Sequence, residues 1–290
     1  MQSDQLGLFG DGEPSPERKS KLGHANIEYK DSGSILTPTS GFMDTYDFSI
    51  NPYSGCSFGC TYCYAAFFSR NAEKMANWGK WVQTKQNALA LLAKKRAGAL
   101  NGKTLYMSSV TDPYQPIDRD LELTRGLLQI LWNRHPEVRL VIQTRSPMVT
   151  RDIDLLSKFS AVQVNMTVTT DDEEVRKVFE PYCPSNVARL KGIQEVREAG
   201  IRSCITMTPL LPVSDPEAFA WKMKETGVEH YIIQPFHSAK GKFVAGTRDQ
   251  AMALLERFNW DDEEYQRVLA IFQRVIPEIG VGKAGFAPPV

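Results

Sequence analysis

The chain has 290 residues and equal numbers of acidic and basic side chains, 34 of each, so its formal net charge is zero. This balance points to neither nucleic acid nor a membrane surface as a partner, and a basic binding groove would have to be local. No apolar run approaches the roughly 20 residues that span a bilayer, and the N-terminus shows no secretory pattern. We therefore expect a cytoplasmic globular protein that does not associate with membranes.

Residues 1–40 are polar and lack periodicity, which predicts a flexible N-terminal tail. Six runs rich in Val, Ile, Thr and Tyr then predict strands at 47–53, 103–109, 138–144, 161–168, 201–208 and 229–235. Helical patterns follow in turn at 85–98, 120–134, 150–159, 186–199 and 216–226. Asp215 followed by Pro216 is typical of a helix start.

This alternation of strands and helices predicts an α/β fold with parallel strands joined by right-handed crossovers. We place the core in residues 41–238. Residues 247–275 carry two more helical patterns, so residues 239–290 are expected to form a C-terminal helical extension. Sites in such folds lie at the carboxyl ends of the strands, and a cysteine-rich loop directly follows the first predicted strand.

Three of the five cysteines lie within that loop: Cys56, Cys60 and Cys63, spaced C-x3-C-x2-C. Reduced thiols at this spacing could wrap one inorganic centre, and Gly55 and Gly59 would relieve the crowding of the backbone. One alternative is structural zinc, which needs a fourth ligand from a distant part of the chain. The spacing favours an iron–sulfur cubane, in which three thiolates leave one iron open for a small molecule.

The stretch CSFGCTYCY resembles the cluster loop of the radical S-adenosylmethionine (SAM) superfamily. The resemblance implies a partial (β/α)6 barrel and a [4Fe–4S] cluster held by Cys56, Cys60 and Cys63. It further implies that the open iron binds SAM, which is cleaved to a 5′-deoxyadenosyl radical that abstracts hydrogen from a substrate. An external electron donor of the flavodoxin or ferredoxin type is a further implied partner.

Other segments between about residues 41 and 238 are similar to the spore photoproduct lyase-like branch, also called DNA repair photolyase-like. They are MSSVTDPYQPIDRDLELT, VIQTRSP, MTVTTDD and VFEPYCPSNVARLKGIQEVREAGI. This similarity implies lyase or related radical chemistry on a DNA lesion, with DNA as a partner. The alternatives are a radical SAM enzyme that modifies a protein or small molecule, and a zinc-stabilised binding protein without activity.

The resemblance also implies roles for individual residues. Tyr64 and Ser109 are the candidate catalytic positions. The candidate SAM-binding residues are Tyr62, Ser108, Arg145, Thr167, Thr169, Glu180 and Arg189. Each has a plainer interpretation: an arginine exposed at the rim, threonines that favour strands, or a structural Glu180–Arg189 ion pair.

The chain departs from true spore photoproduct lyase at one of these positions. Ser109 stands where that enzyme has a hydrogen-donating cysteine, and a serine O–H bond is too strong for that task. Cys183 could replace it as the donor, or be incidental.

Residues 5–9, QLGLF, resemble the peptide with which bacterial repair and replication proteins bind the sliding clamp. Apolar residues in a polar tail commonly insert into a partner's groove. The sliding clamp is therefore a further candidate partner; chance similarity and packing of the tail on its own barrel are the alternatives.

Overall fold

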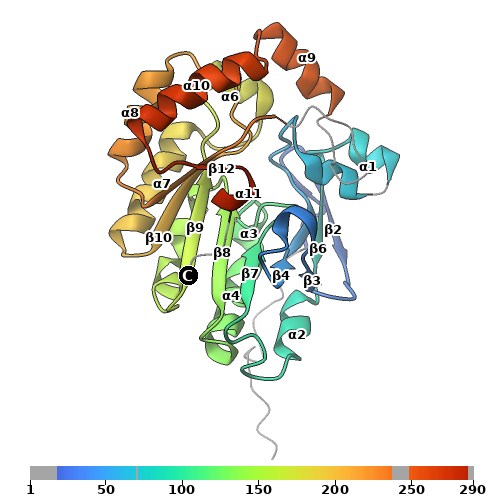
Figure 1. Cartoon of the computed structure of the whole chain (residues 1–290). Helices are drawn as coiled ribbons and strands as arrows, with labels where there is room; N and C mark the ends of the chain where they lie inside the picture. Colours follow the sequence, from blue (N-terminus) through green and yellow to red (C-terminus); the bar gives the residue numbers. More distant parts are fainter. Residues whose placement is uncertain (1–17, 70, 237–247, 287–290) are drawn as a thin grey trace, which may run out of the picture.

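The computed structural model describes residues 18–69, 71–236 and 248–286. Its centre is an eight-stranded sheet in the order β12-β11-β10-β9-β8-β7-β4-β3 (Figure 1). All neighbouring strands are parallel except β3, which runs antiparallel to β4. The strands are β3 (Leu36–Pro38), β4 (Phe48–Ile50), β7 (Thr104–Met107), β8 (Arg139–Thr144), β9 (Val162–Thr167), β10 (Arg202–Met207), β11 (His230–Ile233) and β12 (Gly280–Val281).

All six predicted strands are confirmed, as β4, β7, β8, β9, β10 and β11, and helices connect them as expected. These are α2 (Ala88–Ala93), α3 (Asp118–Leu121), α4 (Leu123–Arg134), the 3-10 helix η3 (Pro147–Asp152), α5 (Ile153–Leu156), α6 (Glu173–Phe179), α7 (Asn186–Glu198) and α8 (Pro216–Glu225). The expected start of α8 is also confirmed, because the Asp215 carboxylate accepts a hydrogen bond from the Ala218 amide at 3.0 Å.

The two faces of the central sheet differ in chemistry, because successive side chains in a strand point to opposite sides. On β8, Leu140 and Ile142 are fully buried in the same core as Leu127 and Leu131 of α4. Gln143, the residue after Ile142, lies on the other, inner face, among polar side chains of β9 and β10. Helices thus cover the outer face, and the fold is the expected partial (β/α)6 barrel.

A second sheet lies beside the barrel in the order β1-β2-β6-β5 (Figure 1). Its strands are β1 (Lys21–Leu22), β2 (Ala25–Lys30), β5 (Tyr53–Gly55) and β6 (Trp81–Lys85). The expectation of a tail up to residue 40 is therefore wrong for residues 21–38, which form β1, β2 and β3. In β2 only Ala25 and Ile27 are buried, and two apolar side chains give too weak an alternation to predict a strand.

The two predicted C-terminal helices are confirmed as α9 (Asp249–Arg257) and α10 (Asp262–Val275). Phe272 of α10 packs edge-to-face on Phe219 of α8, with ring centroids 5.5 Å apart. The segment then adds β12 to the central sheet and ends in the short helix α11 (Gly282–Gly285). No helix in the described parts of the chain is long and apolar enough to cross a membrane.

Candidate functional site

The cysteine loop begins where β5 ends and runs into the 3-10 helix η2 (Tyr64–Ser69), which is followed by α1 (Ala72–Ala76). Two glycines shape it as expected. Gly55 has φ +75°, and a Cβ there would lie 2.6 Å from the Trp81 ring and carbonyl. Gly59 has φ +63° and packs against Tyr182 and Gly79. Neither position suits a residue with a side chain, so both glycines let the chain wrap the three cysteines.

The three thiols differ in their surroundings. Cys56 and Cys60 are buried, and Cys63 is half-buried. Burial, followed by the charge of Asp112, raises the pKa of the Cys56 thiol. Burial and the neighbouring Cys60 raise the pKa of Cys63 to about 12. The pKa of Cys60 is lowered instead, chiefly by a hydrogen bond with Cys183.

This donor set fits an iron–sulfur cluster better than zinc. In the described part of the chain, no three His, Cys, Asp or Glu side chains converge closely enough to hold one metal ion. A structural zinc site requires such convergence on a single centre. The thiolates of a cubane bind separate irons, so they need to line a larger volume, and thiolate is the ligand that these clusters use.

Four of the candidate SAM-binding residues surround a fifth, Glu180, whose carboxylate is fully buried at the end of α6. Arg189 of α7 binds one carboxylate oxygen at 2.5 Å, and both side chains have no exposed surface. The other oxygen accepts hydrogen bonds from the hydroxyls of Tyr62 and Thr169. Arg145, just after β8, donates to the Tyr62 hydroxyl at 3.0 Å and lies 3.6 Å from Glu180.

The charges around Glu180 determine the protonation state of its carboxylate. Burial would raise the pKa of Glu180, but Arg189 and then Arg145, with the hydrogen bond from Tyr62, hold it at about 2. Glu180 is therefore a carboxylate at neutral pH, surrounded by two cations. The Arg145 side chain is 19% exposed, so an anionic ligand can reach part of it, whereas its Nε is buried without a hydrogen bond, 3.6 Å from Glu180.

The two candidate threonines, Thr167 and Thr169, lie in different parts of the barrel. Thr169 joins the Glu180 cluster, whereas the Thr167 hydroxyl lies deeper, bonded to Thr206 and Gln143 on the inner face of the barrel. Residues two apart on a strand point to the same side, and the 3.3 Å rise per residue carries Thr167 away from the rim. The side chain of Thr167 therefore belongs to the polar interior of the barrel.

The end of β7 brings the two candidate catalytic residues together. The Tyr64 hydroxyl donates a hydrogen bond to the backbone carbonyl of Ser109, and the Tyr64 ring is 46% exposed. The neighbouring Ser108 has a left-handed φ of +75°, and its buried hydroxyl has no partner. Strained backbone and an unsatisfied buried hydroxyl are typical of ligand sites.

Asp112 and Gln115 support the site through hydrogen bonds. Both side chains are buried. Asp112 accepts hydrogen bonds from the Thr144 hydroxyl and the Arg145 amide, both at 2.8 Å, which fixes the end of β8. Gln115 accepts one from the Ser57 amide at 3.0 Å, inside the cysteine loop. His24 also contacts this loop, because its Nε2 hydrogen-bonds to the Ser57 carbonyl at 2.8 Å.

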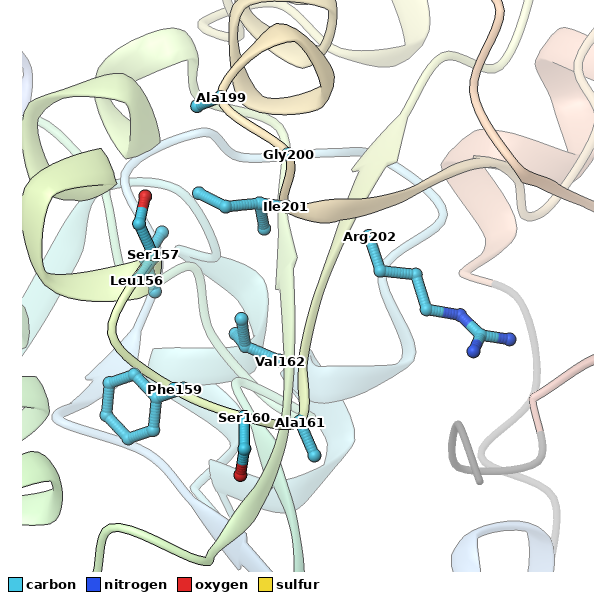
Figure 2. Close-up of a pocket in the computed structure, with 10 residues that line it drawn as sticks. All are labelled: Leu156, Ser157, Phe159, Ser160, Ala161, Val162, Ala199, Gly200, Ile201 and Arg202. Carbon is cyan, nitrogen blue, oxygen red and sulfur yellow. The ribbon is translucent and has the colours of Figure 1, made fainter.

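A separate cavity of about 210 Å³ lies at the opposite end of the barrel (Figure 2). Residues between 156 and 162, before β9, and between 199 and 202, before β10, line it. Figure 2 shows the Arg202 side chain extending away from the apolar side chains of the lining. The cavity lies at the amino ends of two strands, away from the cysteine loop, so it is not the site of the chemistry.

Comparison with known proteins agrees with this geometry. The model of the radical SAM superfamily matches residues 50–220, more than half of the chain, so the chain belongs to this superfamily. Its cofactors are accordingly a [4Fe–4S] cluster and SAM, and the zinc alternative is set aside.

The chain is also similar to particular proteins. An uncharacterized protein of Methanocaldococcus jannaschii is 38% identical over 163 residues, which are 56% of this chain and only 60% of that protein. An uncharacterized protein of Acidianus two-tailed virus is 26% identical over 238 residues, covering 76% of this chain and 74% of that one. Spore photoproduct lyase complexed with dinucleoside spore photoproduct shares the fold, with a TM-score of 0.59 at 13% identity over 88% of this chain and 81% of that chain.

Proposed function

We propose that this radical SAM enzyme acts on a damaged base in nucleic acid, by lyase or related radical chemistry. The observation that carries the proposal is a group of exposed aromatic side chains on η2, next to the cysteine loop. Tyr64, Phe67 and Phe68 are 46%, 37% and 60% exposed, and the rings of Tyr64 and Phe68 stand edge-to-face at 6.1 Å. Exposed aromatic rings are the side chains on which unstacked bases pack.

Within this proposal, Cys56, Cys60 and Cys63 hold the cluster, and the Arg145 guanidinium binds the SAM carboxylate. Tyr62, Glu180 and Arg189 fix the orientation of Arg145, while Ser108 and Thr169 contact the remainder of SAM. When bound and reduced, the cluster supplies the electron that cleaves SAM to the 5′-deoxyadenosyl radical. Tyr64 stands at the rim, where it can relay a hydrogen atom. Ser109 leaves the chain without a thiol donor at that position, so the closing step differs from that of spore photoproduct lyase.

The test is anaerobic turnover of the cluster-loaded protein with dithionite and SAM, measured as 5′-deoxyadenosine formed. We expect dinucleoside spore photoproduct or an ultraviolet-irradiated oligonucleotide to accelerate it, and the undamaged oligonucleotide not to. Phe68→Ala should remove most of this acceleration, whereas Trp221→Ala, which removes a 48% exposed aromatic side chain on α8, should keep it. Equal rates with damaged and undamaged DNA would instead favour a protein or small-molecule substrate.

Enzymes of this superfamily need an external electron donor, and a flavodoxin or ferredoxin in the cytoplasm is the donor we propose. The sliding clamp is proposed as a further partner through residues 5–9, which lie outside the described residues. Its test is a binding assay with the isolated N-terminal peptide and a bacterial clamp. Binding should be lost in the Phe9→Ala peptide; a wild-type peptide that does not bind would remove the clamp from the proposal.

A further inference from the structure

Cys183 lies against one of the three cluster cysteines. Its sulfur is 3.6 Å from that of Cys60, although 123 residues separate the two in the chain. Both side chains are buried, at 8% and 5% exposed. Among the described residues, this is the one thiol–thiol contact with hydrogen-bonding geometry. Cys183 was a candidate hydrogen donor from the sequence, and the geometry places it beside a cluster ligand.

The backbone holds the two thiols together independently of any metal. The Thr61 amide, next to Cys60, donates to the Phe179 carbonyl at 2.8 Å. Arg176 donates to the Cys183 carbonyl at 3.0 Å from within α6. The cysteine loop and the end of α6 are therefore tied together on both sides of the pair. A disulfide needs an S–S distance of about 2.05 Å, so the sulfurs would have to approach by about 1.6 Å.

We propose that Cys60 and Cys183 form a reversible disulfide when the protein lacks its cluster and meets a peroxide. The Cys60 thiolate attacks one oxygen of hydrogen peroxide and becomes a sulfenic acid, releasing one water after protonation. The Cys183 thiolate then attacks the Cys60 sulfur and displaces the second water. In total, two thiols and one peroxide give one disulfide and two waters, so the thiols lose two electrons and the peroxide gains them.

The disulfide and the cluster exclude each other, because the Cys60 sulfur cannot bind Cys183 and an iron at once. The oxidised chain should therefore not bind iron until a thiol reductant restores the Cys60 thiol. The bond would also keep Cys60 from passing on to the sulfinic acid, which ordinary thiol reductants do not reverse. The disulfide would thus protect Cys60 from irreversible oxidation when the cluster is lost, and reducing conditions would restore the free thiols.

The experiment uses the full chain, stripped of iron by a chelator, treated with hydrogen peroxide, alkylated and digested with trypsin. Cys56, Cys60 and Cys63 all lie in the tryptic peptide 31–70, and Cys183 lies in 178–189. A disulfide between these two peptides is the expected product, and two of the five free thiols should be lost. Dithiothreitol should restore both thiols and, with them, uptake of iron and sulfide.

Three serine variants identify the partners. Cys183→Ser and Cys60→Ser should each abolish the cross-link between the peptides, and Cys183→Ser should show more Cys60 sulfinic acid by mass. Cys204→Ser is the matched control, because Cys204 is buried in a separate cluster with Tyr46 and Tyr106, and it should form the cross-link normally. A wild-type chain that links only within peptide 31–70, or oxidises Cys60 without any link, overturns the proposal. None of these readouts depends on the substrate of the enzyme.

Discussion

Glu180 is the central residue of the candidate site, because its buried carboxylate balances the charges of Arg145 and Arg189. Glu180→Gln keeps the shape but leaves Arg189 buried without a counter-charge. Breaking a buried pair in this way costs about 3–5 kcal/mol of unfolding free energy. Urea unfolding at pH 7 measures the loss. The control is Glu174→Gln, whose exposed pair with Lys177 on the same helix should leave the stability nearly unchanged.

The same carboxylate predicts a pH dependence. Its pKa is about 2 in the folded chain, against 4.5 for an ordinary glutamate. A depressed pKa stabilises the folded state above pH 4.5, and this contribution is lost as the pH falls from 4.5 towards 2. The stability difference between the wild type and Glu180→Gln should therefore be constant from pH 7 to 5 and shrink below 4.5. A difference that stayed constant down to pH 3 would show that Glu180 is not the titrating group.

Arg145 is the residue with which we test SAM binding. Arg145→Lys keeps the positive charge but loses the planar fork that binds a carboxylate with two hydrogen bonds. We expect the Kd for SAM to rise by about 10- to 100-fold, because a hydrogen bond to a charged group contributes about 1.5–3 kcal/mol. Anaerobic calorimetry on protein with equal iron content measures it. Arg125→Lys, which pairs with Asp154 away from the site, should bind SAM as the wild type does.

At the scale of the element, strand β7 ends in a conformation that favours glycine. Ser108 has φ +75°, and its buried hydroxyl lacks a partner, so Ser108→Gly removes both costs. We expect about 1 kcal/mol of added stability together with weaker SAM binding. Ser108→Ala separates the two effects, because it removes the hydroxyl and keeps the strained backbone. A Gly variant that binds SAM as well as the wild type would make Ser108 purely structural.

The strands and the cysteine loop could be predicted from the sequence, whereas the positions of several site residues could not. The barrel strands were predictable because each is a short run rich in Val, Ile, Thr and Tyr, and the cysteine loop because its ligands are neighbours in the chain. The cluster around Glu180 was predictable only through family resemblance, since Tyr62, Arg145 and Arg189 come from three distant segments. Asp112 and Gln115 could not be placed, because a loop carboxylate or amide has the same local sequence whether it faces a ligand or the backbone behind it. The depth of Thr167 could not be predicted for a similar reason, since depth within a barrel is set by register.

In the molecule as a whole, the barrel should fold without the iron–sulfur cluster. The three ligands lie on a loop shaped by Gly55 and Gly59, outside the strands of the barrel, although Cys56 and Cys60 are part of the buried core. Replacing Cys56, Cys60 and Cys63 together with alanine should therefore abolish iron binding, from about four irons per chain, and keep the fold. Iron analysis and circular dichroism measure the two effects, with Cys204→Ser as the control that keeps its iron. A triple variant that unfolds would mean that the loop packing around Cys56 and Cys60 is needed to close the barrel even without the cluster.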